Sequence, residues 1–309
     1  MNIAIVDIGS NTIRLNIYHV EKNEYSILFT KKYTASLASY FEDGQLSEEG
    51  IKTLKKTLKS IQNATSFVTL ESIHYFATAS LRNISNQDEI IAQVKKEMGI
   101  AINLLSQEEE ARLGHIGIEE VYGKTDGLSI DIGGGSTEIS IFEDEKVIAD
   151  FNFSEGSLSL YKRYVDEILP TLDEYNRITE KVKKLLKKKE DEKVDKVDKF
   201  DTLIGIGGSI RVVGKVIQKV ENTDSATEFT VDQLKSVSKK LLNHDKNTLI
   251  AIFKVSPDRI HTITPGVIVL LEVCKWFKVK KILISNKGLR EGYLVDYLQK
   301  SDLQLSIKE

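Results

Sequence analysis

Cysteine, proline and tryptophan are scarce in this sequence of 309 residues, which contains one cysteine, three prolines and one tryptophan. A lone cysteine, Cys274, cannot form an internal disulfide, and its apolar-periodic surroundings predict a buried helical thiol. With so little proline and 41% hydrophobic residues, the composition excludes collagen-like, mucin-like and wholly disordered chains. We expect a folded globular protein that does not use cysteine chemistry.

Zinc-binding patterns and long hydrophobic runs are also missing. The five histidines are scattered, without the spacings that place zinc ligands on one face of an element. No segment approaches the roughly 18 uninterrupted apolar residues of a spanning helix, and no secretory signal pattern opens the sequence. We therefore expect a cytoplasmic protein that has no membrane partner and no metal cage built from protein ligands alone.

Excess charge of one sign is absent as well, because the net charge is only −3. Such a chain has no global field that attracts nucleic acid, so we expect no nucleic-acid partner and a local site for any bound anion. The main local exception is the run 181–199, with nine lysines and five acidic residues. This run is typical of a solvated helix end or linker, and a docking patch for a polyanion is the alternative.

An internal repeat is the most informative feature that is present. Residues 3–18 and 127–142 align without a gap, with Asp7 on Asp131 and Tyr18 on Phe142. Each copy is an apolar strand that ends in Asp, a turn of small residues, and a second strand with alternating polarity, which predicts a β-hairpin. Because β-strands disfavour Asp, its presence at the same place in both copies indicates a functional role.

The turn of each hairpin has the composition of a phosphate cradle. Small residues allow backbone N–H groups to converge on a phosphate oxygen. The two predicted cradles consist of Gly9, Ser10, Asn11 and Thr12, and of Gly133, Gly134, Gly135, Ser136 and Thr137. An Asp beside a phosphate repels it, but the same carboxylate can hold a hydrated Mg²⁺ that neutralises the phosphate oxygens. Asp7 and Asp131 are therefore candidate metal ligands.

Strands and helices alternate through the rest of the chain. Between the two copies, strands are expected at 24–34 and 100–106, a buried strand that runs into a turn at 72–83, and helices at 46–66, 86–99 and 107–123. After the second copy, the pattern strand, glycine turn and helix occurs at 203–219 and again at 281–300. This alternation predicts an α/β protein with a cleft between its halves.

Six blocks of sequence together resemble a known family. DIGSNTIRL, FATASLRNISN, SQEEEARLGHIGI, DIGGGSTE, IGIGGS and SNKGLREGYL occur in the order seen in exopolyphosphatases and guanosine pentaphosphate phosphohydrolases, the Ppx/GppA family. The resemblance is to the short, two-domain form within the actin, sugar-kinase and Hsp70 ATPase superfamily. It implies two ribonuclease H-like domains with an interdomain cleft, at 1–121 and 122–295, a helix at about 296–309 that packs back on the first domain, and a homodimer.

The same resemblance implies roles for individual residues. The glutamate before Ala-Arg-Leu is the base that activates water in the family, which corresponds to Glu110. Since Glu108 and Glu109 precede it at a helix start, the helix dipole is an alternative reason for the acidic triplet. Arg82 corresponds to an arginine that binds phosphate bidentately, although a surface ion pair would also explain it.

Other positions have two possible explanations. Glu138 aligns with Arg14 of the first hairpin, so one could contact phosphate and the other metal or water, or both could simply be solvated. Gly207, Gly208 and Ser209 resemble the superfamily loop that packs beside a nucleotide, and tight packing of strand on helix explains them equally well. Asp7, Asp131 and Glu138 make up the expected metal site.

The implied activity is a Mg²⁺-dependent exopolyphosphatase that releases terminal orthophosphate from inorganic polyphosphate, with Mn²⁺ as a possible substitute metal. The alternatives are a guanosine pentaphosphate phosphohydrolase, a phosphotransferase that uses polyphosphate or ATP, and a non-catalytic alarmone-binding protein. One departure concerns TASLASYFEDG, at 34–44, which lacks an arginine and a glycine found in relatives. Binding of a long polyanion would then depend on Lys31, Lys32 and the run 181–199.

Overall fold

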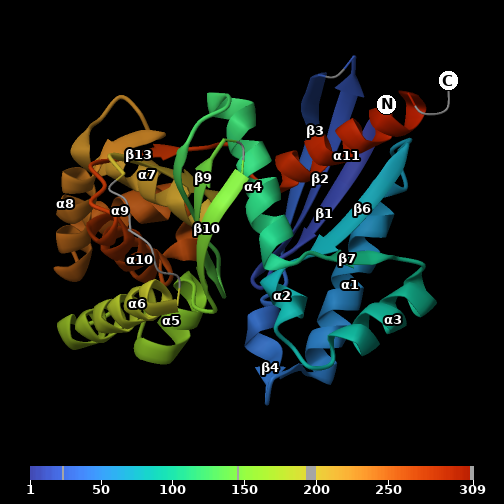
Figure 1. Cartoon of the computed structure of the whole chain (residues 1–309). Helices are drawn as coiled ribbons and strands as arrows, with labels where there is room; N and C mark the ends of the chain where they lie inside the picture. The colour runs from blue at the N-terminus through green and yellow to red at the C-terminus, as the bar shows by residue number, and fades with distance from the viewer. Residues whose placement is uncertain (23, 145, 193–199, 307–309) are drawn as a thin grey trace. The chain divides into compact units, whose positions relative to one another are not determined.

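The computed structural model describes residues 1–22, 24–144, 146–192 and 200–306 (Figure 1). Its contacts divide the chain into two units, Met1–Glu110 together with the chain from Tyr293, and Ala111–Gly292. Both divisions fall within helices, α4 (Gln107–Tyr122) and α11 (Leu289–Ser306). The domain limits expected after 121 and near 296 stay predictions, because compact contact units need not be folding domains.

The first unit contains a sheet with the strand order β3-β2-β1-β6-β7. Strands β1, β2 and β3 are antiparallel neighbours, whereas β6 runs parallel to β1 and β7 runs parallel to β6. The strands are β1 (Asn2–Ile8), β2 (Thr12–Glu21), β3 (Glu24–Thr34), β6 (Ser72–Ala77) and β7 (Ile102–Leu104), and a separate small ribbon pairs β4 (Phe41–Glu42) with β5 (Gln45–Leu46). The first predicted hairpin is therefore confirmed as β1–β2.

The helices of this unit follow their sequence signals. In α1 (Glu48–Thr65), the Ser47 side chain caps the start by accepting from the Gly50 N–H, and Leu54, Leu58 and Ile61 are buried at helical spacing. Short α2 (Ala79–Arg82) follows β6, and α3 (Gln87–Met98) ends at Gly99 with φ 69°. The helices expected in this half are thus present close to their predicted limits.

The second unit repeats the arrangement of the first sheet. Its strand order is β10-β9-β8-β11-β13-β12, with β8, β9 and β10 antiparallel and with β11 parallel to both β8 and β13. The strands are β8 (Gly127–Ile132), β9 (Thr137–Glu143), β10 (Lys146–Phe153), β11 (Thr202–Ile206), β12 (Glu228–Thr230) and β13 (Lys281–Ile284). Three antiparallel strands followed by two parallel ones occur in both units, so the sequence repeat reflects a repeated fold.

Helices complete the second unit, and the most buried of them is α10. These helices are α5 (Ser157–Tyr164), α6 (Leu172–Glu192), α7 (Gly207–Glu221), α8 (Val231–Leu242), α9 (Lys246–Val255) and α10 (Ile263–Trp276), with a 3₁₀ turn η2 (Pro257–Arg259) before α10. Cys274 lies within α10 and is 1% exposed, and burial raises the pKa of its thiol. The prediction of a structural thiol is confirmed.

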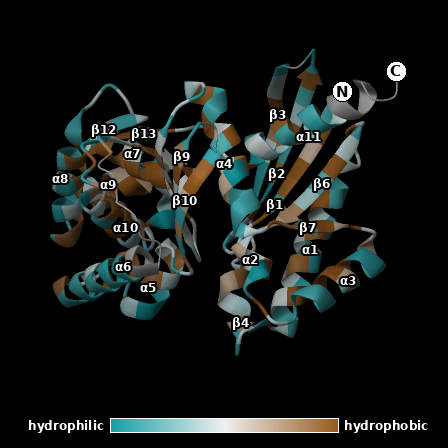
Figure 2. Ribbon diagram, viewed as in Figure 1, coloured by the Kyte–Doolittle hydropathy of each residue, from teal (hydrophilic) through white to brown (hydrophobic). Residues whose placement is uncertain are grey.

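Each unit has its own apolar core, which Figure 2 shows as brown along the central strands β1 and β6 of one unit and along α10 of the other. In the second unit, α4 and the start of α11 pack so closely against each other that no side chain fits between their backbones at two glycines. A Cβ on Gly117 would overlap the Gly288 carbonyl, and one on Gly292 would overlap the Leu113 carbonyl. The glycines of the LGHIG and KGLREG blocks therefore serve helix packing. No helix in the described part of the chain is both long and apolar enough to cross a membrane.

Candidate functional site

The first glycine loop joins β1 to β2 and directs its carbonyls into the protein. The Gly9 N–H donates to the Thr12 carbonyl at 3.1 Å and closes the turn. The carbonyls of Ser10 and Asn11 accept N–H groups from the segment after β3, namely those of Ala35, Ser36 and Ala38. Within the described residues, the N–H groups of Ser10 and Asn11 donate to no protein acceptor. Two adjacent backbone donors are therefore free to bind an anion.

The second loop, between β8 and β9, has the same geometry. The Gly133 N–H donates to the Ser136 carbonyl at 2.9 Å, and the Gly133 carbonyl accepts from Ser157 at the start of α5. The Gly134 carbonyl accepts from the next two N–H groups of that helix, at 2.9 Å each. No hydrogen bond within the described chain uses the N–H groups of Gly134 and Gly135. In each copy, the loop carbonyls thus accept hydrogen bonds from the same unit, and two backbone N–H groups of the loop remain as donors.

The repeated aspartates face different partners across the hairpins. Asp7 is paired in register with Arg14, and Asp131 with Glu138. Side chains directly opposite on antiparallel strands lie about 5 Å apart at Cβ, so the second unit holds two carboxylates side by side. The charge inversion expected from the repeat is therefore a direct cross-strand feature in both hairpins.

The carboxylates of Asp131 and Glu138 are two of the three ligands expected for the metal site. Among the described residues, no group of three or more His, Cys, Asp or Glu side chains could hold a metal ion. Mg²⁺ does not need such a cage, since it commonly binds through one or two carboxylates while water and substrate phosphate complete its coordination. Asp131 and Glu138 fit this donor set, and Asp7 belongs to the other unit.

Gly207 follows β11 and gives the Asp131 carboxylate its position. Gly207 has φ 82°, and a Cβ on it would overlap the Asp131 Oδ1 atom. Only glycine accommodates both conditions without strain. The residue begins α7, whose first turn includes Gly208 and Ser209. The structure therefore shows tight packing at this loop, which was one of the two explanations for its glycines. Gly207 packs against Asp131, which is itself a candidate site residue.

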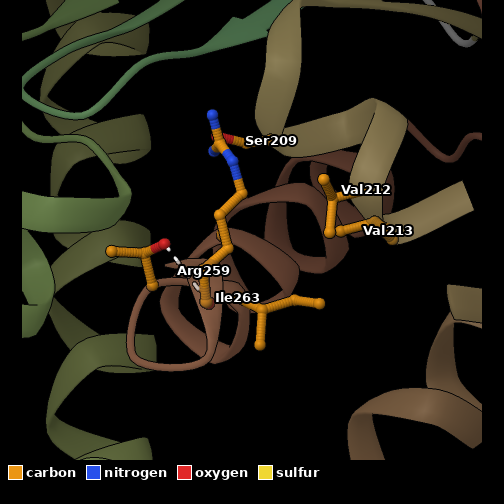
Figure 3. Close-up of a pocket in the computed structure, with 7 residues that line it drawn as sticks. Ser209, Val212, Val213, Arg259 and Ile263 are labelled. Carbon is orange, nitrogen blue, oxygen red and sulfur yellow. Dashed lines mark hydrogen bonds between the residues drawn. The ribbon is translucent and has the colours of Figure 1, made fainter. Parts of the chain in front are cut away.

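Two arginines beside this loop were not predicted from the sequence. Arg259, from η2, donates through Nη1 to the Ser209 Oγ at 3.0 Å, and Figure 3 shows its side chain extending toward Ser209. Together with neighbouring residues of α7 and α10, these side chains line a cavity of about 10 Å³, close to the size needed for one water. Arg211, from α7, donates to the Asn286 carbonyl at 2.9 Å.

The charge of Asp131 acts on both guanidinium groups. Burial lowers the pKa of Arg259, and the carboxylates of Asp258 and, to a smaller extent, Asp131 act in the opposite direction. Burial likewise lowers the pKa of Arg211, the positive charge of Arg290 adds to this effect, and Asp131 opposes it. The charge of Asp131 therefore acts on two arginines of the second unit, Arg211 and Arg259. The charge of a third arginine, Arg290, also acts on Arg211. Such a cluster suits a ligand with several negative charges.

Arg82 and Glu110 form an ion pair in the first unit. Arg82 donates from Nη1 to the Glu110 Oε2 at 2.9 Å and to the Leu105 carbonyl at 2.8 Å. The two side chains are 16% and 14% exposed, so the pair is largely enclosed rather than on the surface. The buried Nε–H of Arg82 has no hydrogen-bond partner among the described residues, which leaves a donor for a further acceptor.

The three glutamates at the start of α4 have different environments. Glu109 accepts from the Ser106 N–H at 2.9 Å, and its own N–H donates to the Ser106 Oγ at 3.1 Å. This is a capping box, readable in the sequence as Ser-x-x-Glu. Glu108 and Glu109 are exposed, whereas Glu110 is partly buried against Arg82. The helix-start explanation therefore applies to Glu109, and Glu110 has a different environment.

Within each unit, the predicted site residues gather at the carboxyl ends of parallel strands. In the first unit, these strands are β1 and β6, and Ser80 of α2 donates its hydroxyl to the Ile8 carbonyl. In the second unit, they are β8 and β11, with Asp131 in register with Ile206. Ligands of open α/β sheets bind at this edge. Thr137 is an exception, because its buried hydroxyl donates to the Glu155 carbonyl at 2.8 Å.

Comparisons with known proteins agree with this fold. The profile of the Ppx/GppA phosphatase family matches residues 16–301. The bifunctional 3-dehydroquinate synthase/phosphatase of Fusobacterium nucleatum is 30% identical over 314 residues, which cover 95% of this chain and 46% of that protein. The guanosine-5'-triphosphate,3'-diphosphate pyrophosphatase of Photobacterium profundum is 22% identical over 299 residues, with coverage of 96% and 59%. The chain therefore spans about half the length of these two relatives.

A solved structure shows the fold along the whole chain. The crystal structure of an exopolyphosphatase from Cytophaga hutchinsonii matches with a TM-score of 0.83 and 21% identity, and covers 97% of this chain and 98% of that one. The α/β, actin-like ATPase fold expected from the sequence is confirmed.

Proposed function

Because the chain belongs to the Ppx/GppA phosphatase family, we propose that it hydrolyses phosphoanhydride bonds and releases terminal orthophosphate from inorganic polyphosphate. The observation that carries the proposal is the duplicated loop. In both copies the carbonyls are tied to the unit, two backbone N–H groups remain as donors, and an Asp is the last residue but one of the preceding strand. This arrangement suits a substrate with several phosphates.

Glu110 is the group that we assign to proton transfer. Its carboxylate would accept a proton from the attacking water, while Arg82 fixes its orientation through the 2.9 Å contact. The Arg82 Nε–H, which has no partner among the described residues, is placed to hold an oxygen of water or phosphate. The pair thus combines a base and a donor in one unit.

The backbone donors and the arginines of the second unit would bind the phosphate chain. The amides of Gly134 and Gly135 supply donors, and Arg211 and Arg259 supply positive charge where the leaving group becomes more negative. Asp131 and Glu138 of the second unit would hold Mg²⁺ or Mn²⁺, which supplies further charge neutralisation at phosphate oxygens, and Asp7 is the corresponding candidate in the first unit.

Guanosine pentaphosphate is the second candidate substrate. The pyrophosphatase from P. profundum, named for such a compound, aligns with 96% of this chain. A terminal phosphoanhydride is common to both substrates, so the same loops and the same base would serve either one. The homodimer and the cytoplasmic location stay predictions, and light scattering tests the first of them.

A phosphate-release assay tests the proposal. Purified protein is incubated with polyphosphates of defined length, guanosine pentaphosphate and ATP, in Mg²⁺ and with ADP as an optional acceptor. We expect orthophosphate from polyphosphate, with no ATP formed from ADP. Conversion of ADP to ATP would instead indicate a phosphotransferase, and tight binding of the guanosine compound without phosphate release would indicate a binding protein.

A further inference from the structure

A groove follows the seam between α6 and α10 in the second unit. Its cavity has a volume of about 440 Å³, and the described residues that line it belong to these two helices. Helix α6 contributes residues at positions 180, 183, 184 and 187, which share one face because they are three or four residues apart. The lining residues are Glu180, Lys183, Lys184, Leu186 and Lys187 of α6 and Glu272, Lys275 and Trp276 of α10.

Lysine dominates the charge of this groove. Two of its four lysines have acidic partners at its rim: Lys183 lies 2.9 Å from Glu180, and Lys275 lies 2.6 Å from Glu272. The negative charges of Glu180 and Glu272 both raise the pKa of Lys183, after its hydrogen bond to Glu180 as the main cause. These contacts show that residues of the two helices act on each other across the groove.

Lys184 and Lys187 supply the charge that remains. Both side chains are exposed, and neither has an ion-pair partner in the described portion of the protein. They lie about one helical turn apart, so their ammonium groups form a row along the groove. Figure 2 shows the hydrophilic colour that extends along α6, in contrast with the brown interior helix α10. The groove therefore presents a row of positive charge beside Trp276.

We propose that this groove binds inorganic polyphosphate outside the glycine loops, as a second contact for a chain whose end is in the catalytic site. The choice of polyphosphate rests on the function proposed above, whereas the requirement for a linear polyanion follows from the row of lysines. A flexible chain with a charge on every unit can contact Lys184 and Lys187 and extend further along the groove, whereas a single orthophosphate cannot extend beyond the two lysines. Part of the lysine-rich segment 181–199 thus has a binding role, and 193–199 lies outside the described residues.

Single-stranded RNA is the competing polyanion, and the position of Trp276 disfavours it. RNA-binding grooves use exposed aromatic faces on which bases stack. Trp276 is only partly exposed and packs against the core of its unit. Lysine ammonium groups act as point charges that suit phosphate without a base. The groove therefore offers charge without a stacking platform.

Trp276 is also the natural reporter, since the chain contains one tryptophan. The wild type is mixed in stopped flow with polyphosphates of about 3, 15 and 100 units, and the Trp276 emission is recorded before turnover. The variant K184Q/K187Q removes the two lysines in question. The control K239Q/K254Q removes the same charge from exposed lysines of α8 and α9.

We expect a saturable change in emission with the longer chains and little change with three units. Exposed charge contacts are individually weak, so K184Q/K187Q should bind the longer chains about 2- to 20-fold less tightly. In K184Q/K187Q, the slope of log Kd against the logarithm of the salt concentration should be smaller by about 1.4, which is about 0.7 for each lysine replaced. Orthophosphate release from tripolyphosphate should not change, and K239Q/K254Q should behave as the wild type in every measurement.

The outcomes separate this proposal from the proposed function. Equal binding of the longest polyphosphate by K184Q/K187Q and the wild type would overturn the groove proposal, even if phosphate release is normal. Lysine-dependent titration of Trp276 in a protein that releases no phosphate would support the groove and refute the hydrolase. Tighter binding of oligouridylate than of polyphosphate would overturn the choice of ligand.

Discussion

Replacement of Glu110 by glutamine separates catalysis from structure at the start of α4. The Glu110 Oε2 accepts from Arg82 at 2.9 Å, and an amide oxygen in the same place can still accept that hydrogen bond. The substitution removes the negative charge and the basic oxygen together, and it leaves the Arg82 cation without its counter-ion. Since both side chains are largely enclosed and the Arg82 charge is left uncompensated, we expect the free energy of unfolding to fall by about 3 kcal/mol.

The expected effect on turnover is much larger. Loss of a general base reduces the rate by about 10²- to 10⁴-fold, so kcat for orthophosphate release from polyphosphate should fall by that factor in Glu110→Gln. KM should change little, because the glycine loops and the arginines are left intact. Urea unfolding of the same preparations shows whether the loss of activity has a cause other than unfolding.

Glu109→Gln is the matched control. It changes the neighbouring carboxylate of the same helix turn, and glutamine is accepted in a capping box. Stability should therefore change by less than about 0.5 kcal/mol, and turnover should stay within about threefold of the wild type. If Glu109→Gln inactivates the protein and Glu110→Gln does not, the assignment of the base is wrong, and the ion pair with Arg82 is a structural contact.

Three further predictions concern the second unit and the metal. Gly207→Ala should lower the free energy of unfolding by about 2 kcal/mol or more and impair phosphate release, because the new Cβ overlaps the Asp131 carboxylate. The control is Gly44→Ala, at φ 76° with open space around it, which should lower the free energy of unfolding by only about 1 kcal/mol and leave activity unchanged. Arg259→Gln should raise KM for polyphosphate and lower kcat more than Ser209→Ala does, and equal effects would show that Arg259 acts only through its hydrogen bond to Ser209. EDTA should abolish phosphate release and leave the urea unfolding midpoint unchanged, and full activity in chelator would refute the role of Mg²⁺ or Mn²⁺.

The sequence was sufficient for features that depend on local pattern. Both hairpins, the cap at Ser47 and the helix that contains Cys274 follow from periodicity and from single residues at helix starts. The aligned copies predict one hairpin in each sheet, whereas the order of the other strands in the two sheets comes from the structure. The capping box at Ser106 and Glu109 is readable in the same way, and its Ser-x-x-Glu spacing by itself distinguishes Glu109 from Glu110.

The arginines around Asp131 depend on packing that no local pattern encodes. Arg259 belongs to a short 3₁₀ turn and contacts Ser209, which lies 50 residues earlier in the sequence, and Arg211 looks like an ordinary helix residue in the sequence. Gly207 shows how these contacts depend on one another, since without it the carboxylate that acts on both arginines would have to move. A buried cation is stable only where its charge is compensated. Asp131 therefore helps to balance the charge of both buried arginines, together with Asp258 beside Arg259 and Glu291 beside Arg211.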